Sequence, residues 1–90
     1  MRKPLITSPS NPLIKQARAL RQKKARVESG LFLVEGIHHV GEAFEAGWEI
    51  ESVLYASGLL TSPFAHDLIS RLSFQPQPVT SQVMESLADK

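Results

Sequence analysis

The chain has 90 residues, of which 42% are hydrophobic and 21% are charged, and its formal net charge is +1. This length suffices for one small domain with a single core, and it excludes a catalytic domain joined to a separate recognition domain. No apolar run approaches the roughly 20 residues of a membrane helix, and the absence of cysteine excludes disulfides and thiolate metal sites.

The basic residues are concentrated at the N-terminal end of the chain. Residues 1–26 contain eight lysines and arginines and no acidic residue, whereas residues 27–90 contain two basic and nine acidic residues. Such a separation of charge is typical of proteins that bind a polyanion, and here it favours nucleic acid over a membrane surface. A basic helix that is merely solvated is the alternative, which charge alone does not exclude. The N-terminus lacks the apolar stretch of a secretion signal, so the expected compartment is the cytoplasm.

The first predicted element is a basic helix. Residues 1–9 predict an extended lead-in, and Ser10-Asn11-Pro12 then predicts a helix start, with a capping side chain followed by proline in the first turn. The helix is expected to run to about Lys24 and to bury a stripe that includes Leu13, Ala17 and Leu20. The expected polyanion-binding side chains on this one continuous rod are Lys15, Arg18, Arg21, Lys23, Lys24 and Arg26.

The predicted mode of binding follows from the residue types of this segment. Because no aromatic residue precedes Phe32, the segment lacks stacking platforms for bases, and contact with phosphates and helix shape is expected. About five such contacts predict a log–log salt slope of roughly −3.5 to −4.5. For Lys23 and Lys24, favourable interaction with the helix dipole is the structural alternative.

A buried strand and a second helix are predicted next. Val27–Gly30 predicts a turn, and Leu31–Val34 is a run of four apolar residues that fits a strand buried on both faces. A helix is expected over residues 37–48, ending near Gly47. His38 and Glu42 share one face of it without a third ligand, so no metal site is predicted, and His39 is expected to pack toward Ala43 and Ala46.

The remaining segments alternate between strands and helices. The predictions are a strand over residues 50–56, a helix that begins at Ser62-Pro63, a short strand near a sheet edge within residues 74–79, and a last helix capped by Thr80 or Ser81. The residues expected to face the core are Phe64, Ala65, Leu68, Ile69 and Leu72 in the first of these helices and Val83, Met84, Leu87 and Ala88 in the last. This order predicts an α/β protein, a three-layer α/β/α sandwich with a small, mainly parallel sheet. No glycine-rich loop follows a strand, so the chain has no nucleotide-binding fingerprint.

An ordered series of residues resembles a known family. Asn11-Pro12, Lys15, Arg26 and the motif Gly30-x-Phe32-x-x-Glu35-Gly36 resemble the N-terminal substrate-binding domain of the SpoU/TrmH (SPOUT) family of RNA 2′-O-ribose methyltransferases. The likeness runs from about residue 6 to residue 90. It implies a fold similar to the ribosomal proteins that bind kink-turns, and a structured rRNA or tRNA as the partner.

The resemblance also implies what this chain lacks. In the family, a knotted and dimeric domain that binds S-adenosylmethionine follows the substrate-binding domain, so such a domain is expected after residue 90. Residues 1–90 then form a single RNA-binding domain without catalytic residues or a cofactor. RNA contact carries over by position to Asn11, Lys15 and Arg26 only, whereas Glu35 is expected to act structurally at a helix start.

Three other readings remain open at this point. The chain could be a stand-alone ribosomal-type RNA-binding protein, or a protein-interaction module whose acidic body is the working face. A small hydrolase built on Glu35, His38 and His39 is the least supported, because no nucleophile or third ligand stands at a recognisable spacing.

Overall fold

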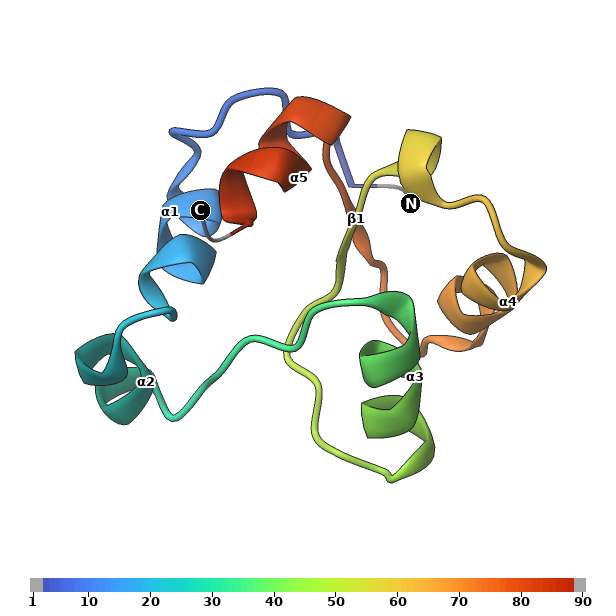
Figure 1. Ribbon diagram of the computed structural model, residues 1–90, viewed down its shortest axis with the longest axis horizontal. Helices are drawn as coiled ribbons and strands as arrows, with labels where there is room; N and C mark the ends of the chain where they lie inside the picture. The colour runs from blue at the N-terminus through green and yellow to red at the C-terminus, as the bar shows by residue number, and fades with distance from the viewer. Residues whose placement is uncertain (1–2, 89–90) are drawn as a thin grey trace.

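Figure 1 shows a computed structural model of the chain, which describes residues 3–88. Arg2, one of the cations counted above, lies outside the described residues. Within residues 3–88 the chain forms five α-helices, a short 3-10 helix and two strands. In chain order these are α1 (Pro12–Ala19), α2 (Lys23–Ser29), α3 (Ile37–Glu45), β1 (Leu54–Tyr55), η1 (Ser57–Leu59), α4 (Pro63–Arg71), β2 (Gln77–Pro78) and α5 (Ser81–Leu87).

The sheet is small and parallel. Leu54 pairs with Gln77 and Tyr55 with Pro78, and one isolated parallel bridge joins Ile6 to Val79. The predicted lead-in thus contributes one paired residue, and β2 is a short strand of a two-stranded sheet. The buried Gln77 side chain donates from Nε2 to the carbonyl oxygens of Pro4 and Pro78, which satisfies its amide inside the protein.

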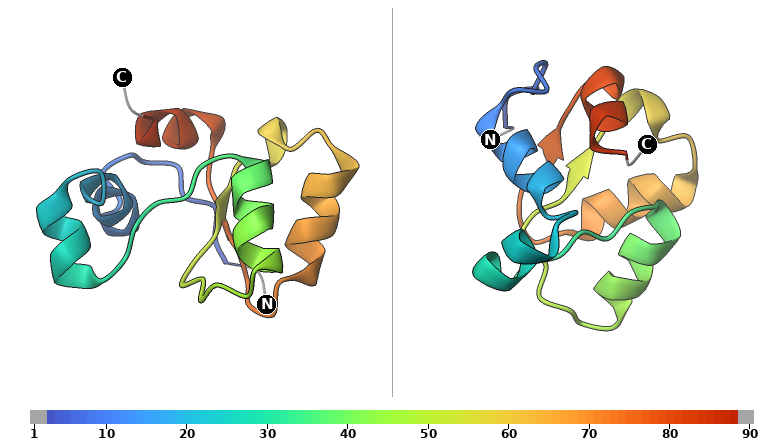
Figure 2. Two further views of the ribbon diagram at one scale, coloured as in Figure 1. Left: turned by 60° about the horizontal axis from the view of Figure 1, so that its bottom comes forward. Right: turned by 60° about the vertical axis from the view of Figure 1, so that its left-hand side comes forward.

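Helices cover both sides of this sheet. Figures 1 and 2 show α1 and α5 together on one side and α3 and α4 side by side on the other. The main core lies under α1 and α5, where Ile14 and Val83 are fully buried against Val79 of the sheet. The predicted α/β class with a parallel sheet is therefore confirmed, and none of the helices in residues 3–88 is long and apolar enough to cross a membrane.

The predicted helix caps are confirmed. The side chains of Asn11, Ser62 and Thr80 accept hydrogen bonds from backbone N–H groups in the first turns of α1, α4 and α5. Proline follows the cap directly in α1 and α4. An N–H group at this first helical position would have no partner within the helix, so proline, which lacks it, costs no hydrogen bond there. Gly47 ends α3 with a backbone φ of +76°, which residues that have a Cβ rarely adopt.

Two predictions for the N-terminal half are wrong. The basic helix is not one rod, because α1 ends at Ala19 and α2 starts at Lys23, and the predicted turn at Val27–Gly30 is mostly helical. Leu31–Val34 is also not a strand within the described structure, and it connects α2 to α3 without a pairing partner. An apolar run becomes a strand only where another strand offers hydrogen bonds, and the sequence pattern contains no information on that partner.

Some burial expectations are also corrected. Phe64 and Ala88 were expected to face the core, but Phe64 is 43% exposed and Ala88 is exposed. His39 is exposed rather than packed, and its Nδ1 lies 3.0 Å from the carbonyl oxygen of Glu35.

Candidate nucleic-acid interface

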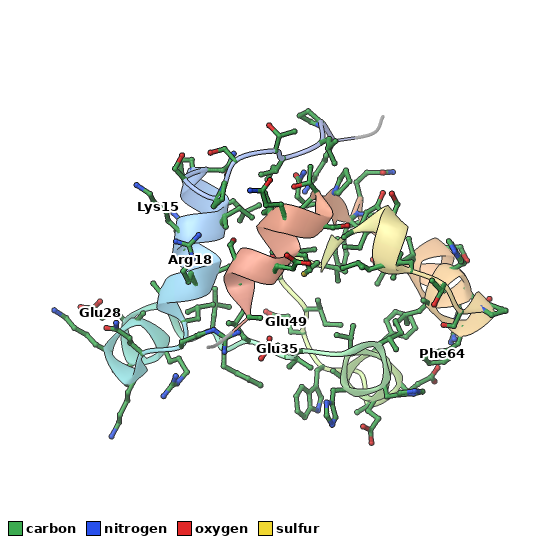
Figure 3. The ribbon with its side chains drawn as sticks, turned by 45° about the horizontal axis from the view of Figure 1, so that its top comes forward. Lys15, Arg18, Glu28, Glu35, Glu49 and Phe64 are labelled. Carbon is green, nitrogen blue, oxygen red and sulfur yellow. The ribbon has the colours of Figure 1, made fainter. Side chains whose placement is uncertain are left out.

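The basic segment begins with a side chain that is already engaged. Oδ1 of Asn11 accepts a hydrogen bond of 2.9 Å from the N–H of Leu13 and so caps α1. The amide of Asn11 orients the first turn, from which Lys15 projects one turn later. In Figure 3, Lys15 points from α1 away from α5. The role of Asn11 in the structure is therefore to position the helix that carries the first lysine.

Arg26 explains why the basic segment bends. Its Nη1 donates to the carbonyl oxygens of Leu20 and Arg21, at 2.9 and 2.8 Å. These carbonyls lie just past the end of α1, where no further helical N–H groups follow, and a cation there also complements the helix dipole. The guanidinium group thus holds the turn between α1 and α2.

Two more arginines bind backbone carbonyls. Nη2 of Arg18 donates to the carbonyl oxygen of Pro9 at 2.8 Å, which fastens the lead-in to α1. Arg21 donates through Nε, at 3.0 Å, and through Nη2 to the carbonyl oxygen of Leu87 at the end of α5, and its Nη2 lies 3.0 Å from Oε1 of Glu35. Glu35 thus forms an ion pair with Arg21, and α3 has no side-chain cap hydrogen bond at its start, where Glu35 was expected to act.

The lysines behave differently from the arginines. Lys15, Lys23 and Lys24 are exposed, and their side chains make no hydrogen bond or ion pair to another residue within 3–88. A positive charge without a carboxylate partner keeps its full attraction for an external anion. Of the seven candidate side chains, these three make no hydrogen bond or ion pair within residues 3–88 that would have to be broken to bind a ligand.

The helix α2 is unusual because none of its residues is buried. It lies beyond α1 at the edge of the molecule (Figure 1). Its Val27 is 72% exposed, and Gly30 ends the helix with φ +73°. A helix this short gains little from its own hydrogen bonds, so its attachment to α1 through Arg26 is what presents Lys23 and Lys24 in an ordered arrangement.

The histidines and carboxylates of the described residues do not gather into a metal-binding cluster. No group of three or more His, Asp or Glu side chains within residues 3–88 is arranged to hold a metal ion. His38 stacks on the ring of Phe64, with centroids 5.9 Å apart and an interplanar angle of 18°. Sequence reasoning missed a different feature, the exposed aromatic pair Phe32 and Trp48, because both residues fit an apolar pattern that predicts burial.

Comparison with known proteins gives consistent matches. Residues 11–90 match the family described as the MRM3-like substrate-binding domain. An uncharacterised tRNA/rRNA methyltransferase of Synechocystis is 34% identical in an alignment 76 residues long. The match covers 72% of this chain and 28% of that protein.

Solved structures agree with this match. A crystal structure of an RNA 2′-O-ribose methyltransferase superimposes with a TM-score of 0.83 at 31% identity, and an rRNA methyltransferase from Sinorhizobium meliloti with a TM-score of 0.70 at 30% identity. In both cases the match covers 97% of this chain and 33% of the other protein. The chain thus spans about a third of the length of these relatives, and the resemblance noted in the sequence is confirmed.

Proposed function

Since the chain belongs to the family of MRM3-like substrate-binding domains, we propose that it binds the RNA substrate of an rRNA or tRNA 2′-O-ribose methyltransferase. Residues 1–90 act as one RNA-binding domain, and the methyltransferase activity resides in a further part of the protein, after residue 90. That part uses S-adenosylmethionine as methyl donor and forms a homodimer. The domain raises the local concentration of RNA near the active site and orients it.

The observation that carries this proposal is that the arginines of the basic segment bind backbone carbonyls, whereas its lysines have no partner within residues 3–88. Arg18, Arg21 and Arg26 hold backbone carbonyls and so fix the geometry of α1 and α2. The unpaired lysines are left to meet phosphates, and their ammonium groups bind as point charges without sequence preference. The candidate RNA surface therefore consists of Lys15, Lys23 and Lys24, and the other four predicted residues support it.

The proposal predicts the salt dependence of binding. Each phosphate contact contributes about 0.7 to 0.9 to the log–log slope of affinity against salt, so replacing the three lysines with glutamine lowers the slope by about 2 to 2.7. The measurement is the fluorescence anisotropy of a labelled stem-loop RNA at several salt concentrations. Affinity at low salt is expected to fall together with the slope.

A matched control separates local contact from net charge. Lys24→Gln and Arg71→Gln each remove one positive charge, but Arg71 lies on α4 and pairs with Glu45 and Asp67. We expect the first variant to lower the salt slope and the second to leave it unchanged. Equal effects of the two variants, or an unchanged slope in the triple lysine variant, contradict the proposed RNA surface.

A further inference from the structure

Two large aromatic side chains are exposed side by side. Phe32 and Trp48 are 58% and 54% exposed, and their rings meet edge to face with centroids 5.8 Å apart. Phe32 lies on the connector between α2 and α3, and Trp48 follows α3. Aromatic rings are among the side chains that gain most from burial, so a pair left in water is a surface with the properties of a binding site.

The pair lines an open recess along α3 with a volume of about 1030 Å³. Part of the remaining lining is apolar or aromatic and includes Val34, Ala43 and Phe64. Figure 3 shows Phe64 projecting from α4 toward α3. The recess is large enough for a flat ring system to lie against the exposed aromatic faces.

The charges around the recess restrict what can enter it. Glu35, Glu42 and Glu45 are part of its lining. Glu35 is paired with Arg21 and Glu45 with Arg71, at 3.0 and 3.1 Å. These carboxylates repel a phosphate, whereas the ion pairs reduce the field that a neutral group meets. A neutral, planar group is therefore the favoured occupant.

In the sequence, the recess residue Phe32 follows shortly after the lysines of the proposed RNA surface. Phe32 is two residues beyond Gly30, which ends α2, and α2 carries Lys23 and Lys24. The seven residues of α2 rise by about 10 Å. Two extended residues add at most about 7 Å. An RNA strand whose phosphates meet the lysines can thus place a base of a nearby nucleotide at Phe32.

We propose that this recess binds an unpaired nucleobase of the RNA, stacked against Phe32 and Trp48, while the adjoining phosphates lie toward α2. The inference rests on the proposed function and deepens it, because phosphate contacts alone do not distinguish single-stranded from paired RNA. Unstacked bases bind readily to aromatic side chains, and this stacking tolerates any base. The aromatic pair supplies the stacking platform that residues 1–31 lack.

The test uses the single tryptophan of the chain as its reporter. The 90-residue protein is titrated with a single-stranded oligoadenylate, and both the emission of Trp48 and the anisotropy of the labelled RNA are recorded. We expect the emission to be quenched as RNA binds. Phe32→Ala is expected to weaken binding by about 5- to 160-fold, the usual range for loss of one stacking ring, whereas Phe32→Tyr is expected to bind as tightly as the wild type. Leu59→Ala is the control, because Leu59 is 53% exposed on η1, outside the recess, and this variant is expected to bind as the wild type does.

The outcomes distinguish this inference from the proposed function. Unaltered Trp48 emission at saturating RNA, together with wild-type affinity of Phe32→Ala, overturns the stacking site and leaves RNA binding by the lysines standing. Emission that instead changes with protein concentration in the absence of RNA shows that a second copy covers the recess, which also overturns the inference. If the wild-type protein binds no RNA at low salt, both proposals fail.

Discussion

At the scale of residues, arginine and lysine have different roles in this protein. The planar guanidinium group presents several N–H donors in a fixed fork, which suits it to bridging two carbonyl oxygens, as Arg26 does at Leu20 and Arg21. The ammonium group of lysine is a compact and strongly hydrated charge on a flexible stem. Charge counting treats the two alike, so the sequence predicted one set of seven contacts where the structure separates structural arginines from available lysines.

Arg26→Gln tests the structural role of that residue. The variant loses two charge-assisted hydrogen bonds at the turn between α1 and α2, and we expect a loss of about 1.5 to 3 kcal/mol in the free energy of unfolding. Urea denaturation followed by circular dichroism measures it. Lys24→Gln removes the same charge from an exposed side chain and is expected to change stability by less than about 0.5 kcal/mol. Similar stabilities of the two variants contradict the assignment of Arg26 to the turn.

Arg21 and Glu35 form a second test at this scale. Glu35 is exposed and gives up only an ion pair when replaced, so Glu35→Gln is expected to cost less than about 1 kcal/mol. Arg21→Gln also removes the bonds to the carbonyl oxygen of Leu87, and we expect it to cost about 1.5 to 3 kcal/mol. Thermal unfolding of both variants provides the comparison, and a larger effect at Glu35 rules out the contact with α5 as the main contribution.

At the scale of elements, the sequence predicts features that depend on neighbouring residues, but not features that depend on residues farther along the chain. The caps at Asn11, Ser62 and Thr80 depend on side chains next to the helix that they start, so the sequence was sufficient to predict them. The end of α1 depends on Arg26, which reaches back over five and six residues to its carbonyl partners. The failure of Leu31–Val34 to form a strand has the same origin, because strand pairing is decided by segments distant in the sequence.

Gly47 provides a prediction for the end of α3. Its φ of +76° is in the left-handed region, and although a Cβ there meets nothing within 4 Å, the backbone conformation itself disfavours alanine. Gly47→Ala is therefore expected to lower the free energy of unfolding by about 1 to 2 kcal/mol. Gly58→Ala is the control, because Gly58 has no positive φ and an added Cβ makes only an ordinary contact at 3.5 Å with Ser81. Equal urea midpoints for the two variants contradict a conformational role for Gly47.

At the scale of the whole molecule, basic and acidic residues are concentrated at different ends of the fold. The basic helices α1 and α2 lie at one end in Figure 1, whereas α3, with the acidic residues around it, lies at the other. The small parallel sheet joins the two ends through the core under α1 and α5. The charge asymmetry of the sequence predicted this polarity, but the recess at Phe32 and Trp48 emerged only when the fold brought residues from two connectors together.

The most direct test of the account is lysine footprinting of the 90-residue protein on a bound stem-loop RNA. Acetylation of each lysine is measured by mass spectrometry with and without RNA at low salt. The account predicts slower modification of Lys15, Lys23 and Lys24 in the complex. This protection is expected to be lost at high salt, because salt weakens the contacts with phosphates. Equal modification rates of all three lysines in the free and the RNA-bound protein would contradict it.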